Sequence, residues 1–325
     1  MKFQILNANF PKTEEGRVYH MEVKRGEVAN RIITVGDTNR AKMFIQWLDK
    51  DTPVFYLESQ RGFTTVTGKY HGVPISIVGI GMGLSMMDFF IREVRSTVDG
   101  QLAIIRFGSC GTIGAPKVGN MIIPSGAFAI TRNYNYFSNG EDETSLNGEK
   151  PYNFTKAFYA DPMLCKQIEK QLLNSFDEKE IFTGLNATCD SFYSSQGRQD
   201  ENFRDCNSDI FKTITATYPN TVSLEMESFM LYHLASSSTS APLKNSNRVS
   251  DKGNSIKAAA TMMVFADRFR NEFISPEKVQ EVQVIAGLAV LDALVETELS
   301  EVHPESEECV WNTNTSFNTF TLRRE

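Results

Sequence analysis

The chain has 325 residues, of which 41% are hydrophobic and 22% charged, and its formal net charge is −7. This length is compatible with one large α/β domain, and the negative charge argues against a nucleic-acid-binding surface. The five cysteines show no C-x-x-C pair, and we see neither a signal-like segment nor a run of about eighteen apolar residues, so we expect a cytoplasmic protein without a zinc site or a membrane span.

The predicted elements alternate between strand and helix along the first part of the chain. The order is a strand at 31–35, a helix at about 39–48, strands at 63–70 and 73–80, a helix through 87–98, and strands at 102–106 and 121–130. This alternation is typical of an α/β protein with a central sheet. Residues 133–156 are polar and acidic, and we expect a long loop there.

The second part continues the pattern around one interruption. A helix is predicted at 162–176, a strand at 181–187, a helix starting near 224, a strand at 258–266 and an apolar helix at about 276–297. Residues 236–255 are rich in Ser, Asn and Lys, which predicts a mobile surface insertion. No internal repeat or domain boundary is visible.

The stretch IIRFGSCG, residues 104–111, places Arg106 at the end of a predicted buried strand. We expect the glycines after it to form a tight turn, whose N–H groups and the Ser109 hydroxyl would cradle an anion. A buried cation needs either a carboxylate or a bound anion beside it, so Arg106 is either an internal salt bridge or part of an anion site. Arg40, in the first turn of the helix after Gly36, is a candidate second clamp on a phosphate.

Two further motifs offer groups for a ligand. Phe192, Gln196 and Arg198 provide a stacking face, an amide and a planar guanidinium, which together suit a planar heterocycle with carbonyl and N–H edges. A polar loop with a buried anchor is the plain alternative. In LEMES, residues 224–228, the two glutamates either cap the start of a helix or accept hydrogen bonds from a vicinal diol.

The glycine-rich segment GIGMG, residues 79–83, raises a dinucleotide-binding or S-adenosylmethionine alternative. It lacks the third glycine of G-x-G-x-x-G, and no acidic residue ends a strand about 20 residues further on. Close packing of a strand against a helix is the interpretation that this segment favours.

Taken together, the motifs resemble those of the nucleoside phosphorylase family. The quoted segments are GDTNR (36–40), SQRGFTT (59–65), IIRFGSCG (104–111), DSFYSSQGR (190–198), EMES (225–228) and FADR (265–268). They occur in the order and approximate spacing of that family, and the Phe…Gln-x-Arg loop resembles its uridine branch. The resemblance covers residues 17–297 and leaves 298–325 as a C-terminal tail.

The resemblance implies a single three-layer α/β/α domain with a central mixed, partly barrel-like sheet. It implies phosphorolysis of uridine, with deoxyuridine as a further candidate, to uracil and a pentose 1-phosphate in pyrimidine salvage. It also implies a homo-oligomer, either a dimer or a hexamer of dimers, with active sites shared across the interface. Phosphate would be a co-substrate, and no metal or organic cofactor is expected.

The family's functional positions map onto this chain as three subsites. Phosphate would be held by Gly36, Arg40, Arg106 and Ser109, with Arg61 from the neighbouring subunit. Ribose would be held by Met226 and Glu227, with His20 from the neighbour, and uracil by Phe192, Gln196 and Arg198, with Arg268 behind the loop. The residues expected to act in catalysis are Arg106, Gln196, Arg198 and Glu227.

Two departures from the uridine branch leave alternatives open. Gly62 stands where bacterial uridine phosphorylases have a glutamate that helps bind an interface potassium ion, so we expect no such ion, and the hexamer is less favoured. Asp267 lies where the purine branch keeps its acid, which makes a purine nucleoside phosphorylase the second candidate. A nucleoside-binding protein without turnover is the third.

Overall fold

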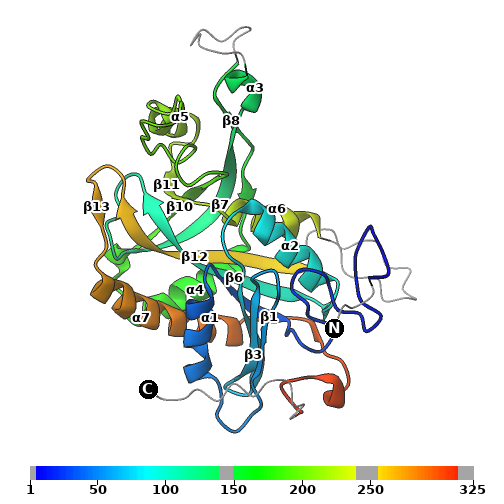
Figure 1. Cartoon of the computed structure of the whole chain (residues 1–325). Helices are drawn as coiled ribbons and strands as arrows, with labels where there is room; N and C mark the ends of the chain where they lie inside the picture. Colours follow the sequence, from blue (N-terminus) through cyan, green and yellow to red (C-terminus); the bar gives the residue numbers. More distant parts are fainter. Residues whose placement is uncertain (1–4, 139–148, 239–254, 314–325) are drawn as a thin grey trace.

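A twelve-stranded mixed sheet runs through the centre of the molecule and carries helices on both faces (Figure 1). The computed structural model describes residues 5–138, 149–238 and 255–313. One face is covered by α1 (Thr38–Met43), α4 (Pro162–Leu172) and α7 (Pro276–Val295), and the other by α2 (Leu84–Arg95) and α6 (Ser228–Ser237). The three-layer α/β/α arrangement expected from the resemblance is confirmed.

The main sheet follows the order β13-β12-β7-β10-β11-β6-β1-β4-β3-β2, with β8 and β9 paired to β7. Its strands are β1 (Arg31–Val35), β2 (Phe55–Glu58), β3 (Thr64–Tyr70), β4 (Val73–Gly79), β6 (Leu102–Thr112), β7 (Met121–Arg132), β8 (Tyr152–Phe154), β9 (Phe158–Tyr159), β10 (Ile181–Cys189), β11 (Thr221–Glu225), β12 (Ile256–Asp267) and β13 (Glu272–Phe273). A separate pair is formed by β5 (Asp99–Gly100) and β14 (Glu301–Val302). The remaining helices are α3 (Tyr134–Phe137) and α5 (Ile210–Thr217), with 3-10 turns at Phe44–Trp47, Glu178–Glu180 and Ser306–Glu308.

Part of the sheet closes on itself. Strand β12 pairs with β7, β7 with β10, β10 with β11, β11 with β6, and β6 again with β12. The other edge of β6 pairs in parallel with β1, which begins the open wing of β1, β4, β3 and β2. This closed ring with an open wing is the partly barrel-like sheet that was expected.

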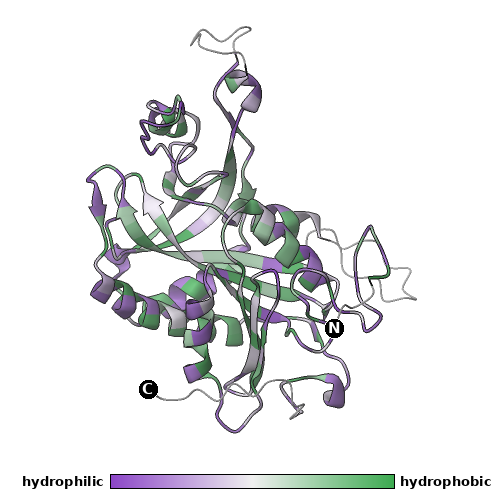
Figure 2. Cartoon of the chain, in the orientation of Figure 1, coloured by the Kyte–Doolittle hydropathy of each residue, from purple (hydrophilic) through white to green (hydrophobic). Residues whose placement is uncertain are grey.

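Two apolar clusters hold the layers together. In one, α1, α4 and α7 pack on the sheet, and in the other α2 and α6 do so. Figure 2 shows the matching distribution, with apolar residues concentrated along the central strands and polar residues on the outer helix faces and loops. Helix α7 has clear boundary signals, because Ser275 caps it by accepting a hydrogen bond from Lys278 N and a proline occupies its first turn.

The structure corrects two sequence predictions. Residues 108–111 are not a tight turn: β6 continues through them to Thr112, because their backbone pairs with β12, where Gly108 lies opposite Met262 and Ser109 opposite Met263. The helix expected from 224 begins only at Ser228, since Leu224 and Glu225 end strand β11. In both places the pairing partner is distant in sequence, so the local pattern did not reveal it.

Several expected segments lie partly outside the described residues. Of the predicted loop at 133–156, residues 139–148 are not described, and the rest includes α3 and β8. Of the predicted insertion at 236–255, residues 239–254 are not described. The first part of the tail packs on the domain: β14 pairs with β5, and Trp311 is buried in a cluster with Ala29 and Phe55.

No helix within the described ranges combines the length and the apolar composition needed to cross a membrane.

Candidate active site

A cavity of about 280 Å³ opens beside the carboxyl ends of the parallel strands β1, β6 and β12. Ligands of α/β sheets commonly bind at this end of the strands. The residues of the predicted subsites that line it are Gly36, Arg40, Arg106, Ser109, Phe192, Gln196, Arg198, Met226 and Glu227. The chain thus brings together motifs that are up to 191 residues apart (227 minus 36).

Arg106 is a buried cation in the wall of the cavity. Its side chain lies over Gly108, two residues along the same strand face, and Arg106 is only 4% exposed. Its Nη2 donates to Glu227 Oε2 at 2.5 Å, while Nε and Nη1 have no hydrogen-bond partner among the described residues. Because buried guanidinium N–H groups are costly to leave unpaired, this geometry favours an anion beside Arg106.

Arg40 adds a second cation to the same wall. Asp37 caps helix α1 by accepting a hydrogen bond from Arg40 N, and Gln283 accepts one from Arg40 Nε at 2.9 Å. Burial lowers the pKa of Arg40, against the attraction of Asp37, and the like charge of Arg106 lowers it further. Two buried arginines that repel each other are stabilised when an anion lies between them.

Glu227 lies at the N-terminal end of α6 and faces the cavity. Its Oε1 accepts a hydrogen bond from Gly83 N at 2.6 Å, and its Oε2 accepts the one from Arg106. Each carboxylate oxygen can accept more than one hydrogen bond, so both remain able to take one from a hydroxyl. The GIGMG segment therefore supports this carboxylate, a role that its sequence alone did not indicate.

The neighbouring Glu225 has a different role. Its buried carboxylate accepts hydrogen bonds from Asn186 Nδ2 (2.6 Å), Thr188 Oγ1 (2.7 Å), Glu227 N (2.8 Å) and Ser228 N (3.0 Å). Burial and the charge of Glu227 raise the pKa of Glu225, with Arg106 opposing them. The capping interpretation of LEMES thus describes Glu225, which orients the backbone carrying Glu227.

The loop after β10 forms the opposite half of the cavity. The Arg198 guanidinium lies 3.5 Å from the ring centroid of Phe192, and its Nη1 donates to Gln196 Oε1 at 2.8 Å. Arg268, behind the loop, donates from Nη1 to the Gln196 carbonyl at 2.8 Å. Burial and the nearby charge of Arg268 lower the pKa of Arg198. An aromatic face, an amide and a guanidinium are therefore held together, as a planar ring with carbonyl groups requires.

Two exposed apolar side chains at the cavity were missed from the sequence. Met82 and Phe273 both line the cavity and are each 73% exposed. Phe273 belongs to the short β12–β13 hairpin, and Met82 to the turn before α2. No sequence signal separates such residues from ordinary surface positions, because only the folded structure shows that they lie beside a cavity.

His20 and Arg61 do not line this cavity. His20 Nδ1 lies 2.6 Å from Glu93 Oε1, and its ring stacks on Phe89. Arg61 lies over the ring of Tyr19, the residue next to His20. The two residues predicted to come from a neighbouring subunit are thus grouped on another part of the chain's own surface.

Asp267 is the residue that suggested a purine nucleoside phosphorylase, and its carboxylate is hydrogen-bonded within the β12–β13 hairpin. Its Oδ1 accepts hydrogen bonds from Phe269 N (3.0 Å) and Arg270 N (2.9 Å), and its Oδ2 pairs with the Arg270 side chain. Burial would raise the pKa of Asp267, but these hydrogen bonds and the Arg270 charge hold it below its ordinary value. An acid with a lowered pKa carries no proton at neutral pH, so Asp267 is poorly suited to protonate a base.

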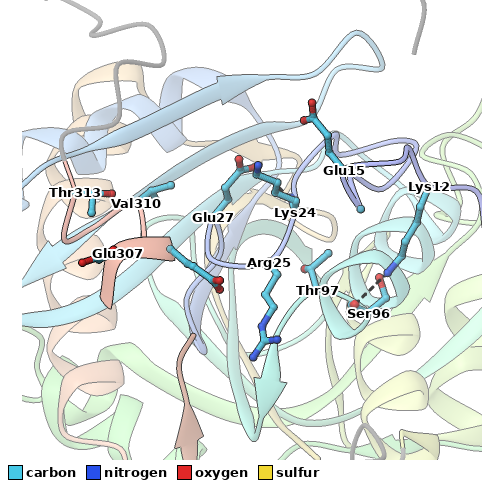
Figure 3. Close-up of a pocket in the computed structure, with 12 residues that line it drawn as sticks. Lys12, Glu15, Lys24, Arg25, Glu27, Ser96, Thr97, Glu307, Val310 and Thr313 are labelled. Atoms are coloured by element: carbon cyan, nitrogen blue, oxygen red, sulfur yellow. Dashed lines mark hydrogen bonds between the residues drawn. The ribbon is translucent and has the colours of Figure 1, made fainter. Parts of the chain in front are cut away.

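A second cavity, of about 470 Å³, is lined by residues of the N-terminal segment, by Ser96 and Thr97 after α2, and by residues 307–313 (Figure 3). Its charged groups are largely engaged: Lys12 Nζ donates to Ser96 O at 3.2 Å, and Arg25 pairs with Asp99 at 2.7 Å. None of the predicted site residues lines it. The smaller cavity is therefore the candidate active site.

The chain also matches known proteins over most of its length. Residues 30–271 match the model of the phosphorylase superfamily. A curated uridine phosphorylase from Thermococcus kodakarensis is 26% identical over 83% of this chain and 84% of its own length. A curated purine nucleoside phosphorylase of the DeoD type from Oceanobacillus iheyensis is 29% identical over 66% of this chain and 80% of its own length.

Solved structures show the same fold. A structure from a study of two uridine phosphorylases of the oomycete Phytophthora capsici superposes with a TM-score of 0.79 and is 35% identical, covering 91% of this chain and all of that one. A Trypanosoma brucei nucleoside phosphorylase, described as having uridine phosphorylase activity, has a TM-score of 0.70 at 19% identity, covering 89% of this chain and all of that one.

Proposed function

The chain belongs to the phosphorylase superfamily and is a nucleoside phosphorylase, and on this premise we propose that it cleaves uridine with inorganic phosphate. The products would be uracil and ribose 1-phosphate, as in pyrimidine salvage. The observation that carries the proposal is that one cavity combines an arginine-lined half, suited to an anion, with a half suited to a planar base. In one half, Arg106 keeps two N–H donor groups without a partner among the described residues, and Arg40 lies beside it. In the other half, Gln196 and Arg198 offer hydrogen bonds to a planar base.

The bond changes follow from the charges around the cavity. A phosphate oxygen bonds to C1′ of the ribose as the bond from C1′ to N1 of uracil breaks. The electron pair of that bond leaves with uracil, which then takes a proton at N1 from water. Positive charge develops on the sugar and negative charge on the base, so a phosphate below the sugar and donors at the base carbonyls both stabilise the transition state.

Each subsite has its own groups. Gly36, Arg40, Arg106 and Ser109 would hold phosphate, and Met226 and Glu227 would hold the ribose, whose 2′- and 3′-hydroxyls would donate to Glu227. Phe192 would stack on uracil, while Gln196 and Arg198 bind its carbonyl and N–H edge and Arg268 supports the loop. Arg198 would move from the Phe192 ring to make room for the base. We propose phosphate as co-substrate, with no metal or organic cofactor.

The active site would be completed by a second copy of the chain. His20 and Arg61 lie together on a surface away from the cavity, and a partner related by two-fold symmetry would bring each pair to the other subunit's site. His20 would then reach the 5′-hydroxyl of ribose, and Arg61 the phosphate. A homodimer is the smallest assembly that satisfies this arrangement.

The purine alternative receives support from the DeoD-type relatives but not from the site. Asp267 is held by Phe269 and Arg270, and the base loop carries a Gln/Arg pair suited to a pyrimidine edge. A nucleoside-binding protein without turnover is disfavoured by the retained arginines. Uridine is therefore the substrate that the geometry supports best.

The test is release of free base from a panel of nucleosides with and without phosphate. We expect phosphate-dependent release of uracil from uridine, and much slower cleavage of cytidine and inosine. Cytosine has an amine where Arg198 needs an acceptor, and an unpaired buried donor of this kind can cost ~10⁴-fold in selectivity. A comparable kcat/KM for inosine would overturn the assignment, as would uracil release that does not need phosphate.

A further inference from the structure

Asn207 lies beneath the base-binding loop and touches both ends of the turn that carries Gln196. Its Nδ2 donates to the carbonyl of Ser194 at 2.9 Å and to the carbonyl of Arg198 at 2.8 Å. Its Oδ1 accepts a hydrogen bond from Gln199 Nε2 at 2.9 Å. All hydrogen-bonding groups of this side chain are thus directed at one loop, and Asn207 is only 4% exposed.

The turn needs such support because few backbone bonds hold it. Gly197 N donates to Ser194 O, Arg198 N donates to Tyr193 O, and Gly197 has a φ of +67°. The segment from 190 to 207 contains no helix or strand, so no ladder fixes its shape. Side-chain hydrogen bonds therefore contribute most of its support: Ser195 Oγ donates to Asp190, Arg268 donates to the Gln196 carbonyl, and Asn207 donates to both ends of the turn.

The backbone before Asn207 indicates that its position is specified. Cys206 has a φ of +48°, in the left-handed region that non-glycine residues rarely adopt. Such strain persists only where surrounding contacts hold it, and it is frequent near functional sites. Here the strained residue directs Asn207 under the turn.

We propose that Asn207 is a positioning residue that sets the base-binding geometry of this enzyme. It does not line the cavity; it acts by holding the Ser194 and Arg198 carbonyls at a fixed separation, so that the Gln196 amide and the Arg198 guanidinium face the base together. The inference rests on the proposed function, because it assigns Gln196 and Arg198 to uracil. Phosphate binding, on the other half of the cavity, is independent of it.

The test compares Asn207→Asp and Asn207→Ala with a matched variant, Asn30→Asp. Asp keeps the shape of Asn but loses both donors, and Ala loses them without adding a charge. Asn30 is also a buried asparagine, 2% exposed, whose Nδ2 donates to two carbonyls, those of Asp99 (2.7 Å) and Gln101 (2.8 Å), before strand β1 and far from the cavity. It controls for the general loss of such a pair of bonds.

We expect both Asn207 variants to raise the KM for uridine by about 10- to 100-fold, because losing two hydrogen bonds lets the turn shift. The KM for phosphate should stay within about twofold, and the preference for uridine over cytidine should narrow. Asn30→Asp should lower the melting temperature and leave both KM values unchanged. If Asn30→Asp does not fold, the unchanged phosphate KM of the Asn207 variants serves as the internal control.

The two proposals fail in different ways. Wild-type enzyme that does not cleave uridine with phosphate overturns the proposed function, and the role of Asn207 with it. Active wild-type enzyme together with Asn207 variants that keep the wild-type KM for uridine overturns the positioning role alone. A parallel loss of uridine and phosphate affinity would likewise contradict it, since that pattern indicates a general structural effect.

Discussion

Arg106 and Glu227, which are 121 residues apart in the chain, form a buried ion pair in which Arg106 Nη2 lies 2.5 Å from Glu227 Oε2. The pair connects two proposed subsites, because we assign Arg106 to phosphate and Glu227 to the ribose hydroxyls. Each residue also keeps hydrogen-bonding capacity for its own ligand. We thus expect phosphate and ribose to bind to the two members of a single ion pair, so that a change in either residue affects both ligands.

Removing Arg106 should therefore affect turnover strongly. Arg106→Ala leaves Glu227 buried without its cation and removes a charge partner of the phosphate, so we expect kcat to fall about 10²- to 10³-fold. Steady-state kinetics at varied phosphate measure this. The matched control is Arg92→Ala, which removes an exposed arginine paired with Asp88 and should leave kcat unchanged. Normal turnover of Arg106→Ala at saturating phosphate would mean that Arg106 is only structural.

Replacing Gln196 should change the preference among nucleosides more than it changes the KM for phosphate. Gln196→Ala removes the amide that we assign to the carbonyl and N–H groups of the base. The kcat/KM for uridine should therefore fall about 10- to 100-fold, and the ratio of kcat/KM for uridine to that for cytidine should become smaller. Competition assays with both nucleosides measure the ratio. Gln167→Ala, on the surface beside Glu296, is the control. An unchanged ratio in Gln196→Ala would remove Gln196 from base recognition.

Replacing Asp267 separates the pyrimidine from the purine assignment. Because Asp267 stabilises the β12–β13 hairpin, Asp267→Asn should lower the free energy of unfolding by about 1–3 kcal/mol and change uridine kcat by less than about threefold. The pKa of Asp267 is lowered in the folded state. Its contribution is therefore present above the unfolded pKa of about 4 and is lost as pH falls through the lowered value.

Denaturant unfolding of both proteins at pH 7 and at pH 3 measures this difference. The gap between wild type and Asp267→Asn should shrink at the lower pH. Loss of turnover comparable to that expected for Arg106→Ala would instead indicate an acid that acts on the base, and would revive the purine assignment.

A mixed dimer tests whether the site spans two chains. Suppose one chain carries Arg106→Ala and its partner carries His20→Ala. If His20 serves the neighbouring site, one site of the pair contains both changes and the other contains neither. Random pairing makes about half the dimers mixed, each with one intact site, so co-expression should restore about a quarter of wild-type activity.

This measurement can be interpreted only if the Arg106→Ala homodimer and the His20→Ala homodimer are each first shown to have little activity. Activity no greater than the sum of the two parents would mean that His20 acts within its own chain or not at all. The outcome does not depend on which base is cleaved, so it tests the assembly separately from the substrate.

The parts of the fold that could be predicted from sequence are those with local signals. Strand β1 was predicted at its observed limits, 31–35, because a β-branched run stops at Gly36. Helix α7 was predicted within two residues, because Ser275 and Pro276 mark its start and its apolar character continues to its end. Neither element needed knowledge of a distant partner.

The parts that could not be predicted depend on contacts between distant residues. Gly108 and Gly111 are typical of a turn, but pairing with β12 keeps them in a strand. The sequence left Arg106 with two alternatives, a salt bridge or an anion site, and the structure contains the carboxylate partner together with unpaired donors. Gly83 N donates to Glu227, and Asn207 donates to the carbonyl of Arg198, and no local sequence pattern indicated either contact.

The position of β6 inside the closed ring has a consequence for motion. Residues 104–106 lie between β1 and β12, so their amides and carbonyls are paired on both edges. These amide protons should exchange with solvent only when the whole domain unfolds, whereas those of 192–199 should exchange through local opening. Hydrogen–deuterium exchange measures both segments at once. We therefore expect the strand that carries Arg106 to keep its shape before any ligand arrives, and the loop of 192–199 to open and close locally without disturbing it.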